Sequence, residues 1–150
     1  LQRKRAAFRN LVARELRPFE GVREELSALD SLPLGLATAS PRRETELMLR
    51  VMGLRELFRA TVTGDDVRNP KPHPETYLTA ARRIGVEPGD CVALEDSPVG
   101  LRSAVQAGLT AIAVANTYPP EKLVEAQKVF ATTAEAIRWI GQRFAAAGSG

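Results

Sequence analysis

Short apolar runs alternate along the chain with longer stretches in which apolar residues recur at helical spacing. The runs predict buried β-strands at about 34–38, 60–63, 91–94 and 110–115, with a short edge strand at 129–130. The helical stretches lie at about 1–16, 22–29, 41–52, 77–84, 98–107, 121–127 and 133–145. Strands that alternate with helices through short loops are typical of an α/β fold, a parallel sheet covered by helices on both faces.

Length and composition narrow the class further. The 150 residues, 44% of them hydrophobic, suit one domain of ordinary size. No apolar run approaches the roughly 20 residues that span a bilayer, so we expect no membrane partner. Cys91 is the single cysteine, which excludes an intramolecular disulfide and favours a reducing cytoplasm. With one cysteine and one histidine, any metal is expected to be a hard cation held by carboxylates.

The formal net charge of +3 is unevenly distributed. Residues 1–17 hold six basic residues against one acid, Glu15, whereas the other 133 carry 15 basic and 17 acidic residues. A sequence pI of about 9.4 is compatible with nucleic-acid binding. However, the basic excess belongs to one helical stretch with little aromatic interleaving. We interpret it as a solvated helix face and expect no nucleic-acid partner.

Polar residues follow three of the predicted strands, where ligands bind in parallel α/β sheets. Thr38 and Ser40 follow the first strand and open a helix, a position that suits an anion but equally a plain helix cap. Lys71 follows the second strand in a proline-rich loop, where it is either a fixed positive charge beside a phosphate or a surface lysine. Glu95 and Asp96 end the third strand and are candidate magnesium ligands; alternatively, Asp96 or Ser97 caps the helix that follows.

Four other residues are expected to have structural roles. Asp65 and Asp66 order their loop through local backbone hydrogen bonds. His73 has no evident partner of the kind that a catalytic base needs. Trp139 is predicted to lie on the inward face of the last helix.

The chain resembles the haloacid dehalogenase (HAD) superfamily in three stretches: LGLATASPRR (34–43), VTGDDVRNPKPHPETYL (62–78) and CVALEDSPVGLRSAVQAGL (91–109). The similarity extends over nearly the whole chain, and the last stretch is the most specific. The subfamily it resembles most includes β-phosphoglucomutase and phosphoglycolate phosphatase. The resemblance implies a HAD-like, Rossmannoid parallel sheet.

The resemblance also implies a phosphate site. Thr38, helped by the Ala39 amide, matches the hydroxyl that binds the transferring phosphoryl group, and Lys71 matches the lysine that neutralises it. Ser40 and Arg42 match positions that touch the distal phosphate of the substrate in the phosphomutase relatives.

Glu95 and Asp96 match the acids that place Mg²⁺, which is the implied cofactor. A true dehalogenase of this superfamily needs no Mg²⁺, so the presence of the acidic pair indicates a different activity. One departure from the family pattern is Pro70, where glycine commonly precedes the lysine.

A larger departure is the absence of Asp-x-Asp, the family motif that supplies the nucleophile and the acid/base aspartate. By resemblance, residues 1–17 are the last helix of an α-helical cap, 18–21 a hinge and 22–150 an incomplete core. The missing central strand lies, in the family, between the strands at 34–38 and 91–95. Its absence exposes two unpaired edges. We hypothesise that the chain is a fragment of a longer protein or requires the missing N-terminal segment in trans.

In the full-length protein the resemblance implies Mg²⁺-dependent phosphoryl transfer from a small phosphorylated metabolite through an aspartyl-phosphate, as a phosphatase or a sugar-phosphate phosphomutase. For this chain alone we expect little or no turnover and weak Mg²⁺ binding. The alternative is a non-catalytic HAD-like binding module, or a subunit completed by another chain. A receiver-type signalling domain fits less well, because its acidic pair and phosphoacceptor aspartate are missing in the required order.

Overall fold

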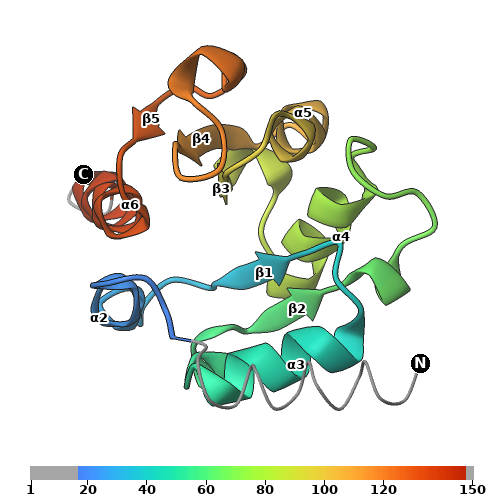
Figure 1. Cartoon of the computed structure of the whole chain (residues 1–150), viewed down its shortest axis with the longest axis horizontal. Helices are drawn as coiled ribbons and strands as arrows, with labels where there is room; N and C mark the ends of the chain where they lie inside the picture. The colour runs from blue at the N-terminus through green and yellow to red at the C-terminus, as the bar shows by residue number, and fades with distance from the viewer. Residues whose placement is uncertain (1–16, 148–150) are drawn as a thin grey trace.

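The computed structural model describes residues 17–147 as a parallel α/β fold (Figure 1). Its strands are β1 (Gly35–Ala37), β2 (Ala60–Val62), β3 (Val92–Glu95), β4 (Thr110–Val114) and β5 (Val129–Phe130). Its α-helices are α2 (Val22–Ser27), α3 (Arg42–Val51), α4 (Glu75–Ile84), α5 (Pro98–Gln106) and α6 (Thr133–Ala147). The cap helix predicted at 1–16 lies outside the described residues. None of the described helices is long and apolar enough to cross a membrane.

The strands form two separate parallel sheets. One has the order β1-β2 and the other the order β3-β4-β5. In the first sheet Leu36 lies opposite Thr61, and in the second Leu94 lies opposite Ile112. Within residues 17–147, no strand pairs with the second edge of β1 or of β3. The parallel α/β class is therefore confirmed, with an interruption between β1 and β3.

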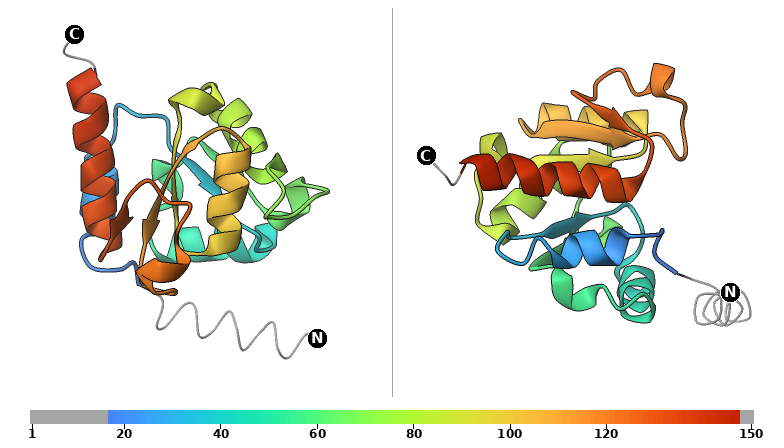
Figure 2. Two further views of the ribbon diagram at one scale, coloured as in Figure 1. Left: turned by 90° about the horizontal axis from the view of Figure 1, so that it is seen from above. Right: turned by 90° about the vertical axis from the view of Figure 1, so that its left-hand side faces the viewer.

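Helices cover both faces of the strands, as predicted (Figure 2). α4 packs on β1 and β2, and α5 packs on β3 and β4. On the opposite side α6 packs against β4, β5 and α2. Each face has its own apolar cluster: Tyr77, Ala93 and Leu101 are buried on the α4–α5 side, and Val22, Leu29 and Ile137 on the α2–α6 side.

Between β1 and β3 lies a cavity of about 550 Å³, here called the slot. Its walls include Leu36 and Ala37 of β1 and Ala93 and Leu94 of β3, with apolar side chains from the helices on both sides. Protein interiors are normally packed with few voids larger than a water molecule. The two half-sheets are thus held together by helices and side chains, while the slot separates their backbones.

Local sequence explains where α5 begins and ends. α5 starts at Pro98, where the missing N–H costs nothing, and the Ser97 hydroxyl accepts a hydrogen bond from the Gly100 N–H at 3.1 Å. Gly108, which follows the end of this helix, has a φ of 86° that a side chain would disfavour.

Two predictions about the C-terminal third need correction. The helix expected at 121–127 is wrong, because only Pro120–Lys122 forms a 3₁₀ turn. The segment after this turn is extended instead, because the Gln127 N–H bonds to the Ala111 carbonyl of β4 at 2.8 Å. This pairing leads the chain into β5. Trp139 is half-buried rather than a core residue, and its ring packs on Phe130 at 5.8 Å between centroids.

Candidate functional site

Polar residues from both half-sheets meet at the carboxyl ends of β1, β2 and β3. Thr38 follows β1 directly, Lys71 lies in the loop after β2, and Glu95 is the last residue of β3. The Lys71 Nζ lies 3.3 Å from the Ala37 carbonyl oxygen and also donates to Glu95 Oε1. The structure therefore brings three of the predicted regions to one edge, as parallel topology requires.

The turn at 38–40 is fixed by β2 and by the residues that follow β2. The Thr38 N–H bonds to the Val62 carbonyl at 2.9 Å, and the Gly64 N–H bonds to the Ser40 carbonyl at 3.0 Å. A Cβ at Gly64 would lie 2.5 Å from the Ala39 carbonyl oxygen, so glycine permits this close approach. Within the turn, the Ser40 N–H donates to Thr38 Oγ1 at 3.1 Å. This leaves the Thr38 hydroxyl proton available for another acceptor.

A small pocket of about 240 Å³ opens beside this turn. It is lined by residues of the turn, of the loop after β2 and of the start of α4: Thr38, Ala39, Gly64, Val67, Arg68, Pro70, Lys71 and Thr76. Three of the predicted phosphate-binding residues, Thr38, Ala39 and Lys71, thus share one pocket. Ser40 and Arg42 are not among the described residues that line it.

Lys71, Glu95 and Tyr77 form a compact group next to the pocket. The Lys71 ammonium and the Tyr77 hydroxyl both donate to Glu95 Oε1, and the ammonium lies 4.8 Å from the centre of the Tyr77 ring. The Lys71 and Glu95 side chains are 13% and 8% exposed, so this ion pair is largely shielded from water. Burial, together with the Glu95 charge and hydrogen bond, raises the pKa of Tyr77 well above its usual value, so Tyr77 stays a donor.

Asp96 and Ser97 have separate roles. The helix cap is Ser97, which leaves the Asp96 carboxylate out of the capping interaction. Asp96 Oδ2 instead accepts a hydrogen bond from the Thr117 hydroxyl at 2.7 Å. Glu95 lies against the first turn of α5, and its carboxylate occupies the space beside Gly100: a Cβ there would lie 2.0 Å from Glu95 Oε2, so a larger residue would displace the carboxylate.

The oxygen donors at this edge fit a hard divalent cation in part. Mg²⁺ commonly takes one or two carboxylates together with water and phosphate oxygens. Glu95 and Asp96 provide two adjacent carboxylates of this kind. Within residues 17–147, no group of three histidine, cysteine or acidic side chains is arranged to hold a metal ion.

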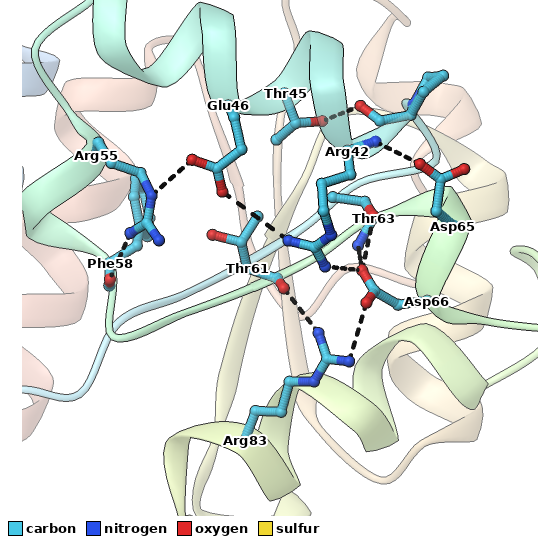
Figure 3. Close-up of polar contacts among 11 residues, drawn as sticks. Arg42, Thr45, Glu46, Arg55, Phe58, Thr61, Thr63, Asp65, Asp66 and Arg83 are labelled. Carbon is cyan, nitrogen blue, oxygen red and sulfur yellow. Dashed lines mark hydrogen bonds and ion pairs between the residues drawn. The ribbon is translucent and has the colours of Figure 1, made fainter.

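The side chain of Arg42 contacts two acids (Figure 3). Its Nη2 donates to Asp66, and its Nη1 lies 3.9 Å from Glu46 Oε1. Arg83 of α4 reaches the same Asp66 carboxylate at 3.0 Å and also bonds to the Thr61 carbonyl at 2.9 Å. Arg42 therefore belongs to a charged network on the outer side of β2.

Asp66 is the centre of that network. Besides the two arginines, it accepts hydrogen bonds from the Thr63 N–H at 2.7 Å and the Thr63 hydroxyl at 2.6 Å. Burial alone would raise the pKa of Asp66, but the hydrogen bonds from Arg42, Thr63 and Arg83 outweigh it and hold that pKa far below its usual range. Asp65 accepts from the Arg42 N–H at 2.8 Å. The predicted local backbone hydrogen bond is confirmed for Asp66, whereas Asp65 bonds to the start of α3 instead of to its own loop.

Sequence reasoning missed two hydroxyl groups at the site. The sequence shows Tyr77 only as an apolar position of a helix, and Thr117 lies in the loop after β4. For Tyr77 one chemical signal was available: a tyrosine on the buried face of a helix usually needs a hydrogen-bond partner for its hydroxyl. For Thr117 the sequence contains no comparable signal.

A haloacid dehalogenase-like hydrolase family model matches residues 2–114. Among curated relatives, validoxylamine A 7'-phosphate phosphatase of Streptomyces hygroscopicus subsp. limoneus is 35% identical over 122 residues, covering 80% of this chain and 57% of the relative. The phosphorylated carbohydrates phosphatase of Thermotoga maritima is 43% identical over 94 residues, which is 61% of this chain and 44% of the relative. The chain thus spans about half the length of the curated relatives it matches.

A solved structure shows the same fold. It is that of CbbY from Rhodobacter sphaeroides in complex with phosphate, and it superposes with a TM-score of 0.78 at 31% sequence identity. The match covers 85% of this chain and 60% of CbbY.

Proposed function

The chain belongs to the haloacid dehalogenase-like hydrolases, of the phosphatase and phosphomutase type, and from this premise we propose that it carries the phosphate-binding half of a phosphoryl-transfer site. The substrate we propose is a small phosphorylated metabolite of the sugar-phosphate class. The observation that carries the proposal is the position of Lys71, which lines the pocket with Thr38 and also pairs with Glu95 across the mouth of the slot.

The residues of the chain have distinct tasks in this proposal. The Thr38 hydroxyl and the Ala39 N–H donate to the oxygens of the phosphoryl group. The Lys71 ammonium compensates the negative charge that these oxygens carry, and preorganised donors of this kind supply most of the catalysis in phosphoryl transfer. The short proline-rich loop and the Gly64 contact keep Lys71 and the turn in place before substrate arrives.

Glu95 and Asp96 are the residues that would hold Mg²⁺. When bound, Mg²⁺ supplies positive charge next to the phosphoryl oxygens. Asp96 is already oriented by Thr117, and Glu95 by Lys71 and Tyr77. The remaining ligands would come from water, from the phosphate itself and from the segment described next.

We further propose that an additional segment inserts a strand into the slot and brings the nucleophilic aspartate to the edge where Lys71 lies. The apolar walls of the slot and the two unpaired strand edges support this role. In this proposal the chain alone is inactive, and the site is completed by an additional segment of the same protein or by another chain. A reducing compartment such as the cytoplasm suits the single, buried Cys91.

The test is a phosphatase screen of the full-length protein on small phosphomonoesters, with and without Mg²⁺. We expect turnover with Mg²⁺ and a loss of about 100-fold or more in Lys71→Ala, because a preorganised donor to the transferring group is removed. Lys122→Ala is the matched control, because Lys122 is exposed and does not line the pocket. This variant should retain full activity. A full-length protein without phosphatase or phosphomutase activity would contradict the proposal.

A further inference from the structure

The two half-sheets are joined at their carboxyl ends by one small group of side chains. Lys71 contacts the Ala37 carbonyl, at the end of β1, and Glu95, at the end of β3. Tyr77 comes from α4, which packs on β1 and β2, and its hydroxyl also reaches Glu95. Because β1 and β3 are not paired through their backbones, these side-chain contacts connect the two strand ends directly.

Tyr77 acts on both partners of the Lys71–Glu95 ion pair. Its ring lies 4.8 Å from the Lys71 ammonium, and its hydroxyl donates to the same oxygen, Glu95 Oε1, that accepts from Lys71. Tyr77 is only 6% exposed, so water competes little for either contact. The other Glu95 oxygen, Oε2, fills the space that Gly100 leaves by having no side chain, and it accepts a hydrogen bond from the Asp96 N–H at 3.4 Å. The carboxylate therefore has little freedom to rotate.

We propose that Tyr77 is a positioning residue of the phosphate site: its hydroxyl holds the Glu95 carboxylate so that Lys71 stays extended across the mouth of the slot, beside the pocket that also contains Thr38. Without the hydroxyl, Lys71 is the one donor that remains for Glu95 Oε1 among residues 17–147. The pair can then rotate together, and the ammonium leaves the place where it meets a phosphate. This role rests on the proposed function, but the contact itself can be tested without any activity.

Tyr77→Phe is the informative variant, because it keeps the ring, its packing and its contact with the ammonium and removes one hydroxyl. Tyr118→Phe is the matched control, since Tyr118 is the only other tyrosine and is 38% exposed. The chain has four lysines, at positions 4, 71, 122 and 128. Carbon-13 labelling of lysine therefore gives few side-chain signals, and Lys71→Arg identifies the one from Lys71.

Two quantities are measured in the 150-residue chain at constant pH and ionic strength: the position and width of the Lys71 signal, and the Kd for inorganic phosphate by titration. In the wild type and in Tyr118→Phe we expect a Lys71 signal displaced from the exposed lysines by the neighbouring ring. In Tyr77→Phe the signal should broaden or move toward the exposed lysines. The Kd for phosphate should rise roughly tenfold, since a charged binding group loses part of its fixed geometry.

The outcomes separate the two proposals. If Tyr77→Phe lowers the melting temperature but leaves the Lys71 signal and the phosphate Kd equal to those of Tyr118→Phe, Tyr77 serves packing alone and the inference is overturned. If the wild type binds no phosphate, the proposed function fails, and the Lys71 signal by itself decides for or against the positioning role.

Discussion

Asp66 shows how a single carboxylate can organise the residues around a site without taking part in it. It is bonded by Thr63 of its own turn, by Arg42 at the start of α3 and by Arg83 of α4. Its side chain is only 12% exposed, so these charged hydrogen bonds are stronger than those on an open surface. The network ties α3 and α4 to the turn that supports Ala39.

Asp66→Asn should destabilise the chain by about 2 kcal/mol at pH 7, because hydrogen bonds to a buried charge are lost. The pKa of Asp66 is lowered by folding, so its stabilising effect is fully present above the unfolded pKa of about 3.9 and is lost as the pH falls below that value. The stability difference between wild type and variant, measured by urea unfolding, should therefore shrink between pH 4 and pH 2.5.

The control for this measurement is Asp30→Asn, an exposed aspartate in the loop after α2, which should change stability by less than about 0.5 kcal/mol at any pH. If Asp66→Asn lowers the free energy of unfolding by the same amount at pH 7 and pH 2.5, Asp66 contributes through its packing and not through its negative charge.

Single residues at the site differed in how well the sequence predicted them. Thr38, Lys71 and Glu95 each follow an apolar run, and a parallel sheet brings such positions to one edge, so their proximity was predictable. Tyr77 and Thr117 act through hydroxyls whose direction depends on how α4 and the loop after β4 pack. Periodicity fixes which face of a helix is buried, but it does not fix which polar atom that face meets.

The start of α5 determines whether Asp96 is available for chemistry. The sequence allowed either Asp96 or Ser97 to cap this helix, and the structure assigns the cap to Ser97, whose hydroxyl accepts from the Gly100 N–H. Ser97→Ala should therefore cost about 1 kcal/mol of stability in urea unfolding, the usual loss of an N-cap.

Ser97→Asp restores a side-chain acceptor at the N-cap and should recover most of that loss. If Ser97→Ala were neutral, the cap would have to come from Asp96, and Asp96 would then be engaged by the backbone rather than free for a cation.

Elements with regular apolar patterns were predicted well, but the path of segment 121–127, which depends on pairing with β4, was not. Helices α3, α4, α5 and α6 each have a clear apolar face, and the strands are bounded by glycine, proline or acidic residues. The segment 121–127 has helical composition, but Leu123 is buried at 1% exposure and Gln127 bonds to β4. Tertiary pairing with β4 therefore overrides local helix propensity there.

At the scale of the whole molecule, the slot decides how stable the chain is by itself. β1 and β3 each have one edge without a strand partner, and the cavity between them has apolar walls. The absence of Asp-x-Asp from the sequence predicted a gap between these strands. It did not predict that two apolar clusters and the Lys71–Glu95 pair would hold the two half-sheets side by side.

We expect the isolated chain to bind a hydrophobic dye such as ANS, because the slot leaves apolar walls and strand edges open. A co-expressed segment with five apolar strand residues followed by Asp-x-Asp should fill the slot and therefore abolish dye binding. Because the segment binds the folded chain and not the unfolded one, it should also raise the melting temperature. The same segment with proline at the centre of its strand lacks a backbone donor and should give no such increase. If the isolated chain is a cooperatively folded monomer without dye binding, and neither segment changes it, the slot is closed by other means and the proposed strand insertion is wrong.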